Sequence, residues 1–254
     1  MTINQSRPLV EFNNLTLGYE MHPAVHHLQG KIVSGDLLAV VGPNGGGKST
    51  LLKGLMGEIR PLGGGITWPQ GHPKLAYLPQ RARLDLDFPL RVIDFVSLGH
   101  WPRRGAFAAI KASDRQAVQQ ALQEVGLAGF DKRSLDSLSG GQLQRVLFAR
   151  LLLEDAPLIL LDEPFAAVDE ATTADLLNLV QQWHQQGRTI IAVLHDLQQV
   201  RSYFPKCLLL ARDALGMGAT AQVLTAENLA KARKMQVLAD PLAPICDFDG
   251  LEVP

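Results

Sequence analysis

The chain has little that would place it outside the cell or across a membrane. Its two cysteines, Cys207 and Cys246, have a spacing that fits neither a metal site nor a disulfide framework. The polar stretch from Met1 to Pro8 lacks the apolar core of a secretory signal, and no run approaches the roughly 18 apolar residues of a membrane-spanning helix. We therefore expect a reducing cytosolic compartment, with both cysteines in the core or incidental.

The chain also has almost no net charge. Lys and Arg number 24 against 25 Asp and Glu, so the formal charge is −1 and gives no bulk attraction to nucleic acid or anionic lipid, although a local patch stays possible. Hydrophobic residues make up 46% and charged residues 19%, which excludes a disordered or collagen-like chain. The 254 residues can form one large domain or two small ones.

Buried strands alternate with helical patterns along the chain. Short apolar runs typical of strands covered on both faces occupy residues 37–41, 158–161 and 189–194. Between them, Ser113 and Gln116 predict a capping box before a helix that Gly126 ends, and a helix that includes Trp183 ends before Gly187. This order predicts an α/β fold with a parallel sheet.

Other segments are expected to add to this core. Residues 9–19 predict an antiparallel strand of a small β layer, and residues 81–137 look like an inserted helical subdomain. The last residues, 232–254, are expected to form a C-terminal tail. The turn at residues 211–216 is irregular for a closing hairpin, so strand assignment stays open there.

A glycine-rich loop follows the first buried strand and leads into a helical run that starts near Thr50. The loop consists of Gly42, Pro43, Asn44, Gly45, Gly46, Gly47, Lys48 and Ser49. Its glycines let successive backbone amides turn toward one anion, Lys48 can reach outer phosphates, and Ser49 can bind magnesium. The alternative is a plain glycine-rich turn, but the strand, loop and helix order favours a phosphate-binding loop.

Two further segments have the chemistry of a nucleoside-triphosphate site. Asp162 ends a buried strand and can hold a magnesium ion, and Glu163 can polarise an attacking water. A strand that stops in a polar turn is the alternative interpretation. Ser139 and Gln142 predict a capping box, with Gly140 and Gly141 exposing amides at the helix start.

The segment Leu138 to Gln142, which reads LSGGQ and is followed by Gln144 and Arg145, resembles the signature of the ATP-binding cassette (ABC) family. The phosphate loop, Gln80, LSGGQ, the Asp162–Glu163 pair, Asp169 and His195 occur in the order of that family's motifs. The resemblance covers roughly residues 9–229. It implies a P-loop NTPase-type parallel sheet with a small antiparallel β layer, in a single ATPase domain over residues 1–231 that includes the 81–137 subdomain.

The resemblance also implies roles that the residues alone leave open. Tyr19 would stack on adenine, although a half-buried core aromatic is the alternative interpretation. Gln80 would contact magnesium or water, and His195 would hold the γ-phosphate, although a turn glutamine and a strand-end histidine are ordinary features. Asp169 could cap the following helix, lie across a dimer interface, or do both.

In this family the signature of one chain meets the phosphate loop of a second copy. The resemblance therefore implies a head-to-tail dimer that binds ATP and Mg²⁺ between Lys48 and Ser49 of one copy and Ser139 and Gly141 of the other. It further implies an integral membrane permease, a periplasmic or surface substrate-binding protein, and a cytoplasmic, peripheral location on the inner face of the membrane. No nucleic-acid partner is expected.

The kind of transporter is indicated by residues 87–99, which resemble the corresponding part of bacterial importers for zinc, manganese and chelated iron. Phe88, Val92 and Phe95 could instead simply pack the helical layer. Two other functions stay open: a soluble ABC ATPase acting on ribosomes or DNA, and an ATPase of a non-metal transporter. The LSGGQ helix argues against a P-loop kinase.

The histidines His22, His26 and His27 have no Cys, Asp or Glu at the spacing of metal ligands. No metal site is therefore expected there.

Overall fold

A computed structural model describes residues 7–20, 22–80, 90–100 and 112–237. The chain forms two compact units, one made of residues 1–73 and 189–254 and the other of residues 74–188. Cys246, Phe88 and most of the C-terminal tail predicted from the sequence lie outside the described residues.

The first unit contains the parallel strands β3 (Leu37–Val41), β7 (Thr189–Val193) and β8 (Lys206–Ala211). β3 lies between the other two and pairs in parallel with both. Every residue of β3 and β7 is buried, as expected for strands covered on both faces. This confirms that the two apolar runs form a parallel sheet.

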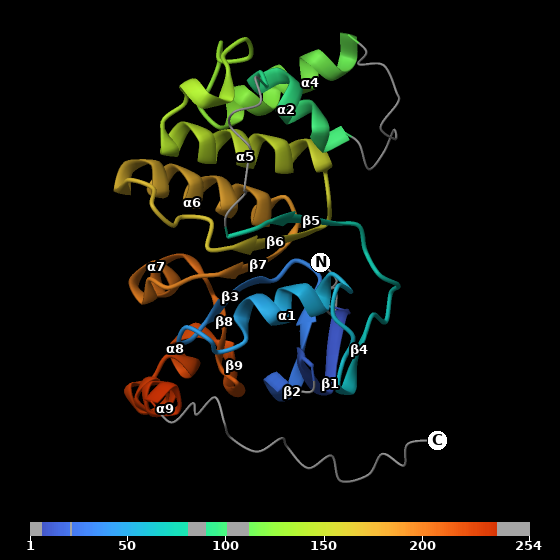
Figure 1. The fold of residues 1–254 in the computed structure, drawn as a ribbon, viewed down its shortest axis with the longest axis vertical. Coiled ribbons are helices and arrows are strands. Elements are labelled where there is room, and N and C mark those ends of the chain that lie inside the picture. Colours follow the sequence, from blue (N-terminus) through green and yellow to red (C-terminus); the bar gives the residue numbers. More distant parts are fainter. Residues whose placement is uncertain (1–6, 21, 81–89, 101–111, 238–254) are drawn as a thin grey trace, which may run out of the picture. The chain divides into compact units, whose positions relative to one another are not determined.

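An antiparallel layer belongs to the same unit, as predicted. β1 (Pro8–Tyr19) pairs with β2 (His22–Val33) on one side and with β4 (Gly63–Thr67) on the other, and Figure 1 shows these strands side by side. β9 (Asp213–Ala219) joins the two parts of the sheet. It pairs antiparallel with β8 and, through His26 and Asp213, in parallel with β2.

The β8–β9 hairpin resolves the segment that the sequence left open. Its register shifts between Leu209 and Leu210, and Arg212 at the turn has a left-handed backbone with φ of 64°. A bulge and a left-handed non-glycine residue break the regular alternation of a hairpin. The segment therefore looks irregular in the sequence although both of its strands form.

Four helices complete the described part of the first unit: α1 (Lys48–Leu55), α7 (Leu197–Tyr203), α8 (Thr220–Val223) and α9 (Ala226–Val237). α1 approaches β1 closely, because a Cβ atom added at Gly54 would lie 2.5 Å from Leu17 Cδ1. α9 continues six residues into the segment 232–254 that was predicted as a tail.

The second unit pairs β5 (Leu75–Leu78) in parallel with β6 (Leu158–Asp162). Its described helical elements are α2 (Val92–Ser97), the 3₁₀ turn η1 (Leu98–His100), α4 (Ala112–Glu124), the 3₁₀ turn η2 (Leu135–Ser137), α5 (Gly140–Glu154) and α6 (Glu170–Gln185). α2, α4 and α5 pack together (Figure 1). The described part of residues 81–137 is thus mostly helical, and Phe95 is buried.

The capping box predicted at Ser113 and Gln116 is wrong. α4 includes Ala112, so Ser113 lies within the first turn rather than before it. Ala112 is a strong helix former and extends the helix past the serine. The predicted stop is correct, because α4 ends at Glu124 and Gly126 has a left-handed φ of 75°.

Cys207 is a free, buried thiol on β8, as expected, and burial raises its pKa to about 12. Such a thiol stays protonated and unreactive at neutral pH. Within the residues that the structure describes, no helix is both long enough and apolar enough to cross a lipid bilayer.

We expect Trp183→Ala to lower the free energy of unfolding by about 3–5 kcal/mol, measured by urea denaturation. Trp183 is fully buried, and its ring stacks on Phe148 with centroids 5.6 Å apart. Trp183→Phe keeps most of this packing and should cost about 1.5 kcal/mol or less, because the indole N–H has no hydrogen-bond partner among the described residues. Equal losses for the two variants would contradict this account of the core.

Candidate functional site

The residues predicted to form the site are divided between the two units. The first unit carries Tyr19, the loop 42–50 and His195. The second carries Gln80, Ser139 to Gln142, Asp162, Glu163 and Asp169.

The glycine-rich loop runs directly from β3 into α1, in the order predicted. Gly42, Gly45 and Gly47 have positive φ angles of 148°, 76° and 89°. A Cβ atom at Gly42 would collide with the Leu210 carbonyl, and one at Gly47 with the Ala24 carbonyl. Only glycine fits at these two positions, and the resulting backbone leaves a cradle free of side chains.

Lys48 opens α1 and turns its side chain back over the loop. Its Nζ donates to the carbonyl oxygens of Gly42 and Pro43, both at 2.9 Å, and the residue is 6% exposed. The first turn of α1 contains no acidic residue. An ammonium group and a helix N-terminus without a carboxylate together favour an anion such as a phosphate.

Tyr19 lies at the end of β1 with an exposed ring. It is 48% exposed, and no other large hydrophobic side chain among the described residues is exposed. Lys53 on α1 donates from Nζ to the Tyr19 hydroxyl at 3.2 Å and lies 5.6 Å from the ring centroid. The ring is thus held to the helix that follows the phosphate loop, and its exposure is what base stacking requires.

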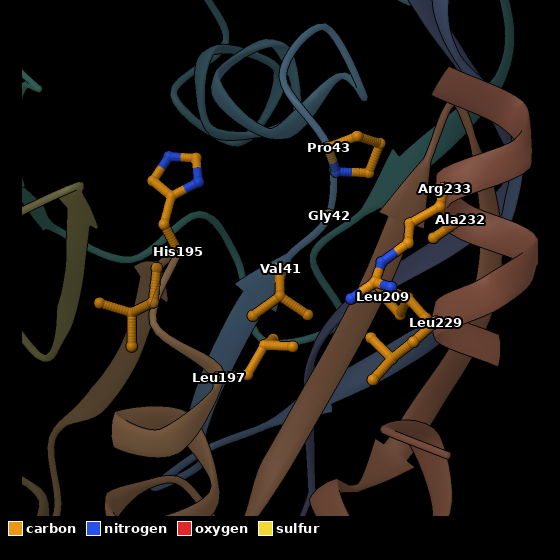
Figure 2. A pocket seen from close by; sticks show the side chains of 10 residues that line it. Val41, Gly42, Pro43, His195, Leu197, Leu209, Leu229, Ala232 and Arg233 are labelled. Carbon is orange, nitrogen blue, oxygen red and sulfur yellow. The ribbon is translucent and has the colours of Figure 1, made fainter. Parts of the chain in front are cut away.

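His195 follows β7 and lines a pocket of about 150 Å³ with Gly42 and Pro43 (Figure 2). Asp196, the next residue, caps α7 by accepting hydrogen bonds from the backbone amides of Gln198 and Gln199. The cap fixes the chain immediately after His195. The fold thus brings together His195 and the start of the phosphate loop, which are more than 150 residues apart in the sequence.

Asp162 and Glu163 stand at the end of β6 in the second unit. Asp162 is buried, whereas Glu163 is partly exposed and has a left-handed backbone with φ of 50°. Gln80 donates from Nε2 to Glu163 Oε2 at 2.7 Å. The structure therefore joins two of the three side chains predicted to be catalytic, and the amide of Gln80 orients the glutamate.

The signature segment starts α5 with the capping box that the sequence predicts. Ser139 Oγ accepts from the Gln142 backbone amide at 3.3 Å, and the Ser139 amide donates to Gln142 Oε1 at 3.1 Å. Ser139 and Gly140 are exposed, and the first turn contains no acid. This helix start is a second position that favours an anion.

Asp169 caps α6, as one of its two predicted roles requires. Its Oδ1 accepts the Thr172 backbone amide at 2.9 Å. Hydrogen bonds from the Thr172 backbone and side chain hold the pKa of Asp169 below its usual range. A Cβ atom at Gly141 would lie 3.2 Å from both Asp169 Oδ2 and Thr172 Oγ1, so the signature glycine packs against this cap.

The sequence does not predict the hydrogen bonds and the ion pair that connect α5 to neighbouring segments. Gln144 Nε2 donates to the Pro164 carbonyl at 2.6 Å, and Arg145 forms an ion pair with Asp175, also at 2.6 Å. Arg145 also donates to the Val125 carbonyl at 3.0 Å. These partners lie 20 to 30 residues away, so no local pattern indicates them.

Comparison with known proteins identifies the family. The family model described as "ABC transporter" matches residues 25–166. The chain belongs to the ABC transporter family. It is 40% identical over 225 residues to the manganese transport system ATP-binding protein MntB of Listeria monocytogenes. The alignment covers 87% of this chain and 94% of the relative.

Two further ABC proteins are similar over most of the chain. The zinc transport system ATP-binding protein TroB of Treponema pallidum is 38% identical, with 88% of this chain and 86% of the relative covered. A solved inward-facing structure of a putative metal-chelate type ABC transporter has 35% identity, a TM-score of 0.81 and 90% coverage of both chains. The chain is thus an ATP-binding and ATP-hydrolysing ABC transporter subunit, and the fold class expected from the sequence is confirmed.

We expect Gly47→Ala to weaken ATP binding at least about tenfold, because a methyl group would displace the loop from the Ala24 carbonyl. Gly45→Ala is the matched control. Gly45 is also left-handed, but a Cβ atom added there would have no atom of a residue beyond its chain neighbours within 4 Å. Gly45→Ala should therefore lower the free energy of unfolding by about 1–2 kcal/mol through backbone strain alone. Equal ATP affinities of the two variants by titration calorimetry would contradict a cradle defined by close backbone approach.

Proposed function

We propose that this ATPase powers the uptake of a metal ion, zinc or manganese, or of a metal chelate, through a separate membrane permease. The observation that supports this most directly is the similarity of nearly the whole chain to a manganese-system and a zinc-system ATP-binding protein. The resemblance of residues 87–99 to the corresponding part of metal importers agrees with it. A ribosome- or DNA-acting ATPase is not favoured by any of these similarities.

ATP binding by the first unit follows from three of its features. Tyr19 offers an exposed ring to adenine, backbone amides of the glycine-rich loop would donate to the phosphates, and Lys48 supplies a positive charge. His195, beside Gly42 and Pro43, would bind the γ-phosphate. Binding energy in this scheme comes from pre-arranged donors and not from induced structure.

We infer that Ser49, Gln80 and Asp162 would hold Mg²⁺, because they offer a hydroxyl, an amide carbonyl and a carboxylate oxygen. Mg²⁺ prefers such oxygen ligands, and when bound it neutralises the charge of the β- and γ-phosphates. Burial of Asp162 at the end of β6 holds its carboxylate in place.

Hydrolysis requires a positioned base rather than a covalent intermediate. Glu163 accepts the proton of the attacking water in this proposal, and Gln80 holds the Glu163 carboxylate through Oε2. His195 aligns the water against the γ-phosphate.

A second copy of the chain completes the ATP site. Gly140 and Gly141 start α5 with no acidic residue in the first turn, so this helix start favours an anion, and Gln142 holds Ser139 in place through the capping box. We infer that these residues bind the γ-phosphate on the partner's phosphate loop, in a head-to-tail dimer with Asp169 near the dimer interface. Cleavage of the γ-phosphate then removes the bridge and opens the dimer.

The remaining partners follow from this role. The dimer would bind an integral permease at the inner face of the membrane, as a peripheral subunit. A periplasmic or surface substrate-binding protein would select the metal.

Glu163→Gln should reduce kcat for ATP hydrolysis by about 10²–10⁴-fold while leaving ATP affinity intact, because it removes the base but keeps the side-chain size. It should also lengthen the lifetime of the ATP-bound dimer, measured by size-exclusion chromatography with light scattering. Steady-state hydrolysis at the original rate would exclude Glu163 as the base.

Lys48→Ala should weaken ATP binding by about 10- to 100-fold, the range expected for a charged hydrogen bond. Lys31→Ala serves as the control, since Lys31 is an exposed lysine on β2 that has no role in the proposed site. If titration gives Lys48→Ala unchanged affinity, the lysine does not contribute to the cradle.

The substrate is tested with the complete transporter in proteoliposomes. We expect external Mn²⁺ or Zn²⁺, delivered by the binding protein, to stimulate ATP hydrolysis and to accumulate inside the proteoliposomes. Glu163→Gln should abolish both the hydrolysis and the accumulation. ATP hydrolysis without metal accumulation would refute the proposed substrate but leave the ATPase assignment in place.

A further inference from the structure

The side chain of Gln144 connects two functional segments of the second unit. Gln144 lies in the second turn of α5, just after the signature residues, and donates from Nε2 to the carbonyl of Pro164 at 2.6 Å. Pro164 is buried and directly follows Glu163. One partly buried hydrogen bond therefore joins the signature helix to the peptide next to the general base.

The segment that receives this bond has an unusual backbone. Glu163 and Ala167 both have left-handed φ angles, 50° and 59°, and neither is a glycine. The Ala166 amide donates to the Glu163 carbonyl at 3.2 Å and closes a turn between them. Left-handed non-glycine residues persist only where their surroundings hold them, so contacts to this turn fix the direction of the Glu163 side chain.

The other end of the connection is a rigid helix start. The capping box ties Ser139 to Gln142, and Gly141 packs against Asp169 and Thr172. Arg145, next to Gln144, pairs with Asp175 on α6. Because this helix start is held by several contacts, Gln144 moves together with Ser139 and Gly141 when they are displaced.

We propose that Gln144 is a positioning residue that makes the placement of Glu163 depend on the state of the signature segment. This rests on the proposed ATP-sandwich dimer, in which Ser139 and Gly141 contact the partner's nucleotide whereas Glu163 acts on the chain's own nucleotide. The Gln144–Pro164 hydrogen bond then connects, within one chain, the signature segment at the partner's nucleotide to the base at the chain's own nucleotide. Through this bond, ATP bound at the first site aligns Glu163 at the second.

The test uses Gln144→Met, which keeps the length of the side chain and a similar helix propensity but removes the N–H donor. We expect kcat to fall about tenfold, as a small displacement of a base produces, with the KM for ATP within about twofold of the original value. The Hill coefficient for ATP should fall from about 2, the number of sites in the dimer, toward 1.

A rescue variant and a control separate this role from a merely structural one. Gln144→Lys restores an N–H donor toward the Pro164 carbonyl and should recover much of both kcat and cooperativity. Gln182→Ala, an exposed glutamine on α6, should leave both unchanged. Thermal unfolding midpoints of all variants identify any loss of folded protein.

The outcomes distinguish this inference from the dimer on which it rests. The inference is wrong if Gln144→Met keeps the original kcat and Hill coefficient, or if Gln144→Lys is as impaired as Gln144→Met. ATP-dependent dimerisation is measured separately in Glu163→Gln. If that variant stays monomeric with ATP, the proposed dimer itself fails, whatever the Gln144 variants show.

Discussion

The close approach of backbone to backbone around the phosphate loop is the constraint on which the rest of the site depends. Gly42 lies against the Leu210 carbonyl and Gly47 against the Ala24 carbonyl, so β8 and β2 fix the two ends of the loop. β3 pairs in parallel with β7 and β8, and β9 connects β8 to β2. The hydrophobic core thus determines, through contacts that allow no side chain, where the loop's amides point.

Little charge is needed to attract an anion to the two helix starts. The chain is nearly neutral, yet neither α1 nor α5 has an acid in its first turn, and Lys48 adds a positive charge at α1. In the proposed site, attraction for a triphosphate would therefore come from backbone amides and one lysine. Such a site discriminates by geometry, because amides fixed by the backbone cannot follow a misplaced anion.

The sequence was sufficient where structure depends on neighbouring residues. Strand, loop and helix order around Gly42 to Ser49 could be predicted, as could the capping box at Ser139, because both are set by local backbone chemistry. The same reasoning failed at Ser113, where a serine and a glutamine at capping distance lie inside a helix that Ala112 extends. Contacts of Gln144 and Arg145 were beyond prediction, since tertiary packing alone brings Pro164 and Asp175 to them.

The glycine at position 54 has a consequence for the helix that carries Lys48. A Cβ atom at position 54 would lie 2.5 Å from Leu17 Cδ1, so a side chain there would have to displace the buried Leu17, and α1 keeps a residue that costs a helix about 1 kcal/mol relative to alanine. An eight-residue helix with this weakness has little stability of its own and depends on tertiary contacts and ligand. Amide hydrogen exchange in α1 should therefore slow more on nucleotide binding than exchange in the buried strands, which makes this short helix a natural reporter of site occupancy.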